Sequence, residues 1–362
     1  MPADSAAPVP TSVPSIVSFR ERVTAILAGT DRAPPRPHVI VLGVDGIPYD
    51  LACRTWRRAH LTRARSVFPT TSSTAWLSSL TGASVDAHGI PGVVFTVDEQ
   101  GGPLIDVYAY QGPLGDAPPE DLFSDAARCG YTPVAILGDL EDTHCTWRDL
   151  LVHRAHQVHG HRFFSRLAGS IDSLDPLELC GRLEVAMEHA LASHPGPCLV
   201  WCFIDADRHI HRNGYDRPLV ELLERIDAIA GEWARRGARV IAHSDHGLVP
   251  TRHDPAIADA IERVTAAHAC AMGGAGRTRW LYTAPGTEQR VWDDLARRLP
   301  ASVRLHHADA LFAPGSLARR RVGSIVLVAE GEDFLAADGY QFEHGSLTER
   351  ELDVPFAEWR AC

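Results

Sequence analysis

An aspartate and a histidine follow a mostly apolar run in the second half of the chain. Residues 239–244 lead directly into Asp245, His246 and Gly247. A buried carboxylate must be paired or must coordinate a metal ion, because an isolated buried charge is costly. Carboxylate oxygen and imidazole nitrogen are ligands that suit zinc and similar divalent ions. A solvated loop past a strand is the alternative, so a metal site needs ligands from other parts of the chain.

Two other apolar runs end in residues of the same kinds. The run 38–44 leads into Asp45. The run 198–204 is followed by two pairs of an aspartate and a histidine four residues later, Asp205 with His209 and Asp207 with His211. Residues four apart share one face of a helical turn, so either pair could chelate one ion. The alternative is a hydrogen bond between an aspartate and a histidine at a helix start, and residue chemistry alone does not choose the pair.

Alternating strands and helices position these residues. Strands are predicted at 38–45, 131–137, 198–204, 239–245 and 321–329. Helices are predicted at 75–80, 121–129, 176–192 and 218–236. This alternation indicates an α/β domain with a largely parallel central sheet flanked by helices. Ligands of such sheets lie beyond the carboxyl ends of the strands, where the aspartates fall. The chain is predicted to end in a polar loop and a short apolar stretch at 354–356.

Two segments differ in composition from this domain, which we expect to span residues 37–362. Residues 1–36 are rich in Pro, Ala and Ser. We expect a flexible lead-in, or an arm packed on the body, with a short amphipathic helix at 15–27 before the prolines end it. Residues 140–175 are polar and predict a small cap lobe. The histidines at 153, 156, 159 and 161 lack a carboxylate or thiolate partner in register, which favours a solvated surface over a third metal site.

Composition excludes several classes of function. The chain has 362 residues, is 45% hydrophobic and carries a formal net charge of −11, which is typical of a globular protein that does not bind a nucleic acid polymer. No apolar run approaches the roughly 18 residues that span a bilayer. The eight cysteines contain no CxxC pair, and we see no signal peptide, so we expect reduced thiols and a cytoplasmic location.

Several short motifs occur in a fixed order. They are Asp45-Gly46, Phe68-Pro69-Thr70, Thr81-Gly82, His88-Gly89-Ile90, Asp207 with His211 and Gly214, Asp245-His246-Gly247, and His344-Gly345. This set resembles the alkaline phosphatase superfamily and, within it, the nucleotide pyrophosphatase/phosphodiesterase branch. The resemblance runs from about residue 38 to 356 and implies an alkaline-phosphatase-like fold. The glycine at 214 fits the family pattern only for the pair Asp207 and His211.

The resemblance also implies a nucleophile and two divalent metal ions. Counting from Pro69 and from Gly82 gives Ser72 as the nucleophile, with Thr71, Ser73 and Thr74 as neighbours one or two residues away. A helix N-cap is the alternative for this cluster, and it is compatible with phosphate binding. One ion would take Asp207, His211 and His344. The other would take Asp45, Asp245, His246 and the Ser72 oxygen. Mixed Asp and His ligation favours zinc.

The expected activity is hydrolysis of a phosphodiester or pyrophosphate bond in a small phosphorylated substrate, through a phosphoseryl intermediate. Val93 stands where the diesterases of this branch have an asparagine that contacts a phosphoryl oxygen. Arg208, Arg212 or Asn213 could replace that contact. The alternatives are a phosphomonoesterase, a phosphonate hydrolase, a phosphoryl-transferring mutase and a metal-binding protein without turnover. Residues 70–76 lack the sulfatase motif. Trp76 is predicted to be a core residue rather than a platform for a base.

Overall fold

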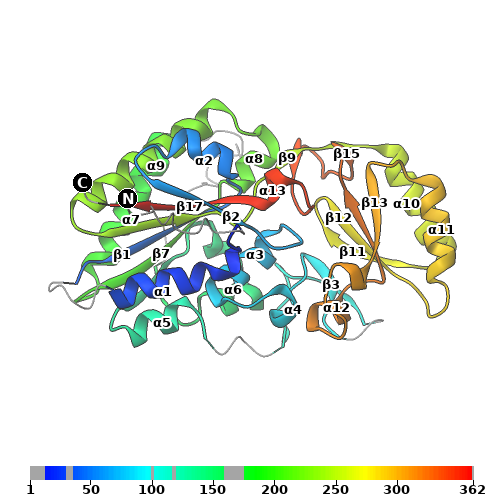
Figure 1. Ribbon diagram of the computed structural model, residues 1–362, viewed down its shortest axis with the longest axis horizontal. Helices are drawn as coiled ribbons and strands as arrows, with labels where there is room; N and C mark the ends of the chain where they lie inside the picture. The colour runs from blue at the N-terminus through cyan, green and yellow to red at the C-terminus, as the bar shows by residue number, and fades with distance from the viewer. Residues whose placement is uncertain (1–12, 30–35, 99–101, 116–119, 159–174, 361–362) are drawn as a thin grey trace, which may run out of the picture.

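The computed structural model describes residues 13–29, 36–98, 102–115, 120–158 and 175–360. It contains two main sheets side by side, a large central one and a smaller one in a second lobe (Figure 1). Among the described residues, no helix has both the length and the apolar character needed to cross a membrane.

The central sheet has seven strands in the order β2-β17-β8-β1-β7-β5-β6. Their bounds are β1 Val39–Val44, β2 His60–Arg65, β5 Thr132–Ile136, β6 His156–Val158, β7 Cys198–Ile204, β8 Arg239–His243 and β17 Asp353–Trp359. Five strands are parallel, and β17 runs antiparallel to both β8 and β2. Gly43 pairs with both Phe203 and His243, so the carboxyl ends of β1, β7 and β8 lie side by side. The predicted α/β class and largely parallel sheet are therefore confirmed.

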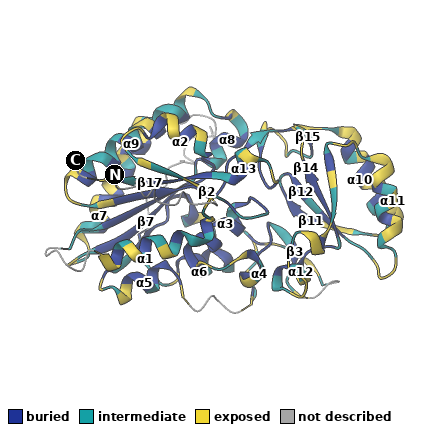
Figure 2. Cartoon of the chain, in the orientation of Figure 1, coloured by how far each residue is buried: buried dark blue, intermediate teal, exposed yellow. Residues whose placement is uncertain are grey.

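Helices cover both faces of this sheet, whose strands are largely buried (Figure 2). One face packs against α2 Tyr49–Thr55, α7 Pro176–Ala192 and α9 Arg217–Arg235. The other packs against α1 Phe19–Gly29, α3 Ser72–Thr81, α5 Leu122–Arg128 and α6 Thr146–Val152. Alternate residues of β1 enter the two cores, with Ile40 and Leu42 on one side and Val39 and Val41 on the other. This two-sided burial explains the unbroken apolar run of β1.

The second lobe is a six-stranded sheet in the order β13-β14-β12-β11-β3-β4, with antiparallel pairs throughout. The strands are β3 Val94–Thr96, β4 Leu104–Asp106, β11 Ala271–Ala275, β12 Thr278–Tyr282, β13 Val303–His307 and β14 Ile325–Ala329. Helices α10 Pro255–His268 and α11 Glu288–Arg298 bury a third apolar core against it. On this lobe, α4 Val85–His88 contacts α12 Leu317–Arg321.

Short elements lie in the segments that connect the two sheets. They are β9 Val249–Pro250, β10 Arg252–His253, β15 Asp333–Phe334, β16 Phe342–Glu343 and α13 Glu349–Leu352. The helix α8 Asp207–Asn213 follows β7, and 3-10 turns occur at Ile16–Ser18, Gly138–Asp142 and Ala308–Ala310. β16 pairs with β9, and β10 pairs with β15. The chain therefore passes between the sheets several times near the carboxyl ends of the central strands.

The cap lobe predicted at 140–175 is wrong for residues 140–158. There, β6 joins the central sheet beside β5, and α6 buries Trp147, Leu151 and Val152 in the main core. β6 has only three residues, too few to show a strand period in the sequence, and polar neighbours hide the apolar face of α6. Residues 159–174, with His159 and His161, lie outside the described part. The second lobe comes instead from the segments that carry β3, β4 and β11 to β14.

At the N-terminal end, residues 13–29 form an arm packed on the body, one of the two forms expected, because α1 buries Phe19, Val23 and Leu27. Residues 1–12 and 30–35 are outside the described part. The other end of the domain differs from expectation. The stretch expected as a polar loop with 354–356 is the strand β17, inserted between β2 and β8. The late strand expected at 321–329 begins at Ile325, since Arg321 ends α12.

Candidate active site

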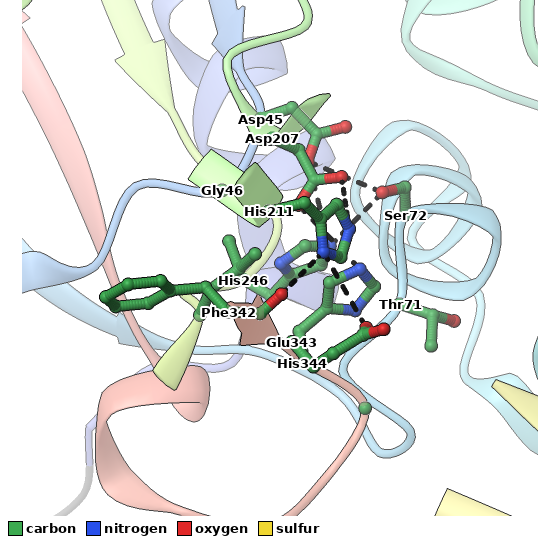
Figure 3. A network of polar contacts seen from close by, with 12 residues as sticks. Asp45, Gly46, Thr71, Ser72, Asp207, His211, His246, Phe342, Glu343 and His344 are labelled. Atoms are coloured by element: carbon green, nitrogen blue, oxygen red, sulfur yellow. Dashed lines mark hydrogen bonds and ion pairs between the residues drawn. The ribbon is translucent and has the colours of Figure 1, made fainter. Parts of the chain in front are cut away.

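Ser72 is the first residue of α3, directly after a turn out of the extended segment 66–71. Its Oγ lies 3.1 Å from Nε2 of His246 and 3.4 Å from Oδ1 of Asp45 (Figure 3). The neighbouring hydroxyls point elsewhere. Ser73 Oγ donates to the carbonyl of Gly92 at 2.9 Å, and the hydroxyls of Thr71 and Thr74 lie 2.9 Å apart. Of these four hydroxyl groups, that of Ser72 is the one in contact with the predicted ligands.

Asp45, Asp245 and His246 form one group behind Ser72. Nε2 of His246 lies 3.1 Å from Oδ2 of Asp245 and 3.7 Å from Oδ1 of Asp45. The second oxygen of Asp45 accepts a hydrogen bond from the indole of Trp76 at 3.1 Å. Trp76 is fully buried, as predicted for a core residue, and it also orients this carboxylate. A Cβ at Gly247 would lie 2.2 Å from the carbonyl of Arg350, which explains the glycine after the Asp-His pair.

Asp207, His211 and His344 form a second group, with the first two on α8. Nε2 of His211 lies 3.0 Å from Oδ2 of Asp207, and Nε2 of His344 lies 3.7 Å from Oδ1 of Asp207. Each Nδ1 donates to a backbone carbonyl at 2.7 Å, that of Phe342 for His211 and that of Thr70 for His344. These bonds fix the ring orientation and leave both Nε2 atoms directed at the carboxylate.

The competing pair Asp205 and His209 is separated. Nε2 of His209 contacts Oδ1 of Asp216 at 2.9 Å, and Asp205 accepts from the backbone N–H of Arg208 at 3.1 Å. Asp207 and His211 are therefore the pair that shares one site with His344.

Two buried carboxylates, the half-buried Asp207 and three buried histidines lie in one small space and match the donor set of divalent metal ions. Burial, followed by the charges of Asp245 and Asp207, raises the pKa of Asp45 well above its ordinary value. Burial also lowers the pKa of His246 well below its ordinary value, so the ring is neutral, as metal ligation requires. Among the described residues, Asp207 Oδ1, Asp245 Oδ2 and His246 Nδ1 are buried without a hydrogen-bond partner. Cations in this space would satisfy the carboxylates.

A cavity of about 770 Å³ opens from these residues toward the second lobe. Ser72, Asp45, Asp207, His211 and His344 line one part of it. The β11–β12 hairpin lines another, from Met272 to Gly276 together with Arg279. Four aromatic side chains also line the cavity, those of Tyr108, Trp147, Phe203 and Tyr340. The cavity is far larger than a phosphoryl group, so it has room for the rest of a small substrate.

The sequence model of the family described as type I phosphodiesterase / nucleotide pyrophosphatase matches residues 39–346. The chain belongs to this family. It is accordingly an enzyme of the metal-dependent phosphoesterase class, as the motifs indicated. A search among curated proteins finds no match.

Solved structures of several hydrolases share the fold. Phosphonoacetate hydrolase from Sinorhizobium meliloti 1021, in complex with phosphonoformate, is 19% identical with a TM-score of 0.64 over 90% of each chain. An inactive variant of murine ectonucleotide pyrophosphatase/phosphodiesterase 5 in complex with AMP is 17% identical with a TM-score of 0.63, covering 90% of this chain and 88% of that one. The human counterpart is 15% identical with a TM-score of 0.60, covering 88% and 87%. At these identities the likeness shows a shared fold.

The structure places two positions of the family motifs, and the residues proposed to replace the missing asparagine. His88 lies outside both metal-ligand groups, where its Nε2 contacts Ser78 Oγ at 2.9 Å, so the His-Gly-Ile motif is part of the scaffold. Val93 does line the cavity, so no side-chain donor replaces the family asparagine there. Of the proposed substitutes, Arg208 lines the cavity, whereas Asn213 is exposed and bonds to His209. Arg212 lies over the ring of Tyr340, 5.9 Å from its centroid.

Sequence reasoning missed several polar residues of the cavity. Among them are Tyr108, Arg279, Tyr340 and Glu343. Glu343 directly precedes a predicted ligand, and its Oε2 lies 3.7 Å from Nδ1 of His211. The others come from the second lobe or its connections, which the sequence pattern did not reveal. The described histidines of the 153–161 tract, His153 and His156, are exposed and lie outside the metal-ligand groups.

Proposed function

We propose that the chain hydrolyses a phosphodiester or pyrophosphate bond with Ser72 as the nucleophile. The observation that carries this proposal is the position of the Ser72 hydroxyl, within 3.4 Å of both an aspartate and a histidine of the same group. The start of α3 adds backbone N–H groups and a helix dipole that favour a bound phosphoryl group.

Two divalent ions are the cofactors in this proposal, with zinc favoured by the mixed Asp and His donors. Asp207, His211 and His344 would hold one ion, and Asp45, Asp245, His246 and Ser72 Oγ the other. When bound, such a pair would lower the pKa of the serine hydroxyl and neutralise charge on the oxygens of the displacement. The orphaned buried oxygens of Asp207 and Asp245 support this assignment.

The chain's own residues carry the covalent chemistry. Ser72 Oγ forms a bond to phosphorus while the bond between phosphorus and the leaving oxygen breaks. Water then attacks the phosphoseryl ester, which releases the phosphorylated product and restores the serine hydroxyl. Trp76 holds Asp45, and the carbonyls of Phe342 and Thr70 hold His211 and His344, so the group is rigid before substrate arrives.

The substrate class follows from the wall around the group. Val93 offers no side-chain hydrogen bond, which suits a diester with one negative charge on phosphorus better than a monoester dianion. Phosphonate hydrolysis is a second candidate, because the fold is shared with phosphonoacetate hydrolase.

The seven described cysteines are all free thiols, which supports a reducing, cytoplasmic location.

A pair of variants tests the nucleophile. Ser72→Ala should retain both metal ions by elemental mass spectrometry yet lose nearly all turnover of a thymidine monophosphate p-nitrophenyl ester. Ser73→Ala is the matched control, since it removes a buried hydroxyl of the same helix and should cost only about 1–3 kcal/mol of stability. An active Ser72→Ala, or an inactive Ser73→Ala that is still folded and metal-loaded, contradicts the assignment.

Substrate comparison tests the bond type. Bis-p-nitrophenyl phosphate, p-nitrophenyl phosphate and phosphonoacetate are assayed with the zinc-loaded protein. The diester should have the highest kcat/KM of the three. A monoester preference above about tenfold, or roughly 1.4 kcal/mol of transition-state stabilisation, favours the monoesterase instead.

A further inference from the structure

Arg279 lies on β12 in the second lobe and contributes to the cavity wall. Its Nη1 donates to the carbonyls of Gly276 at 2.6 Å and Thr278 at 2.9 Å. Among the described residues, its guanidinium forms no ion pair with a carboxylate, and Nη1 is the only one of its nitrogens that makes a side-chain hydrogen bond. One edge of the guanidinium is therefore held by the turn, and the Nε–Nη2 edge is available.

The turn that holds Arg279 packs directly against a proposed metal ligand. A Cβ at Gly276 would lie 2.0 Å from the carbonyl oxygen of His344 and 3.1 Å from Oε2 of Glu343. The backbone N–H of Arg277 donates to the same His344 carbonyl at 2.7 Å. The turn at residues 276–278 thus holds the guanidinium of Arg279 and also contacts the backbone of His344, a proposed metal ligand.

The other cavity arginine is already paired. Nε of Arg208 lies 3.6 Å from Oδ2 of Asp205, on the same helical turn. The chain contains no lysine, so every side-chain cation other than histidine is an arginine. Arg208 and Arg279 are the two arginines that line the cavity in the described part of the chain. Arg279 is the one without an acidic partner there.

Burial lowers the pKa of Arg279 below its ordinary value, and the charge of Glu343, a carboxylate in the cavity wall, partly opposes that lowering. However, its Oε2 is directed at Nδ1 of His211, 3.7 Å away, and the side chain is buried beside that ring. Arg279 and Glu343 do not form an ion pair, although both line the cavity.

From this arrangement we infer that Arg279 binds a second anionic group of the substrate, a carboxylate or a phosphate, apart from the phosphoryl group that reacts. The inference rests on the proposed function of the same site. A free Nε–Nη2 edge has the geometry for two parallel hydrogen bonds to such a group. The cavity of about 770 Å³ leaves room for both anionic groups of one small molecule.

Matched substrates isolate this contact. Three p-nitrophenyl phosphodiesters share the leaving group and differ in the other ester arm, which ends in a carboxylate, in its neutral carboxamide isostere, or in a phosphonate. The zinc-loaded enzyme should prefer at least one anionic arm over the carboxamide by about tenfold or more in kcat/KM. Arg279→Gln should bring the three values within about threefold, mainly by slowing the anionic substrates. The arm that loses more identifies carboxylate or phosphate as the natural partner.

Arg208→Gln is the control, because it removes the paired arginine of the same cavity, and it should keep the preference. The inference is overturned if the wild-type enzyme shows no preference, or if Arg279→Gln keeps it. Failure of the wild-type enzyme to hydrolyse any of the three esters contradicts the proposed function instead. Calorimetric titration of the three esters into zinc-loaded Ser72→Ala, with and without Arg279→Gln, then measures the effect of Arg279 on substrate affinity without turnover.

Discussion

The buried ion pair between Arg277 and Glu351 predicts a coupling between the second lobe and the proposed metal ligand His344. Both side chains are at most 1% exposed, and Nε of Arg277 lies 3.5 Å from Oε2 of Glu351. Glu351 also accepts from the backbone N–H of Ser346 at 2.8 Å, and the backbone of Arg277 donates to His344 at 2.7 Å. Both ends of the segment 344–346 are thus held by this pair.

The perturbation is Glu351→Gln, which removes the charge and keeps the shape. Breaking a buried pair by neutralising one partner typically costs about 3–5 kcal/mol, because the other charge stays buried. Arg277 keeps hydrogen bonds to Thr251 Oγ1 and to the carbonyl of Gly331, both at 2.8 Å, so we expect about 2–4 kcal/mol. Loosening of His344 should weaken zinc binding at its site about 10–100-fold.

Two measurements separate these effects. Urea unfolding of metal-free protein gives the stability change, and competition with a chromogenic chelator gives zinc affinity. Glu330→Gln is the control, because Glu330 pairs with Arg304 on the same lobe at 3.1 Å while both are about half exposed, which predicts at most about 1 kcal/mol. Adding Arg277→Met to Glu351→Gln should recover stability, since no charge is left buried. Unchanged zinc affinity in folded Glu351→Gln would refute the positioning role.

Two further predictions concern stability in metal-free protein. Burial, and then the charge of Arg321, lowers the pKa of His88 to about 3. The unfolded chain therefore binds a proton that the folded chain does not, and the free energy of unfolding falls as the pH falls from about 6.5 toward 3. His88→Gln should reduce the slope of unfolding free energy against pH in this range by up to about 1.4 kcal/mol per pH unit. An identical slope in urea titrations contradicts this. Phe19→Ala should lower the free energy of unfolding by about 3–5 kcal/mol, because Phe19 is 3% exposed and its ring centroid lies 3.7 Å from that of His243. Val13→Ala is the control at an exposed position and should change the free energy of unfolding by under about 0.5 kcal/mol.

The central sheet and its acids were predictable because each relevant signal is local. The runs that became β1 and β7 are buried on both faces and therefore apolar throughout, and α7 and β7 have the predicted bounds. Parallel strands place their carboxyl ends together, so aspartates that follow such runs had to meet. The choice between Asp207 and Asp205 was not local, since it depends on Asp216, which holds His209 away from the site.

The second lobe was not predictable in the same way, because its strands are short and depend on distant partners. β11 contains Gly273 and Gly274, residues of low strand propensity. A Cβ at Gly273 would lie 2.3 Å from the indole nitrogen of Trp280, so these glycines serve the close packing of β12 rather than the strand itself. The strand β17 was equally hidden, because Pro355 argues against a strand between two neighbours.

This difference explains why the sequence pointed to the proposed nucleophile and metal ligands but not to the cavity wall around them. The proposed ligands that follow β1 and β8 or lie on α8 belong to the predictable sheet and its edge, whereas the cavity wall around Arg279 belongs to the lobe. His344 lies where the two meet, since its Nδ1 donates to Thr70 beside the nucleophile and its carbonyl accepts from Arg277 of the lobe. Gly345 has φ +115, and a Cβ there would lie 2.8 Å from the carbonyl of Ala275. The close packing of residue 345 against the lobe therefore requires a glycine, and its substitution should shift His344 and weaken zinc binding, as competition with a chromogenic chelator would measure.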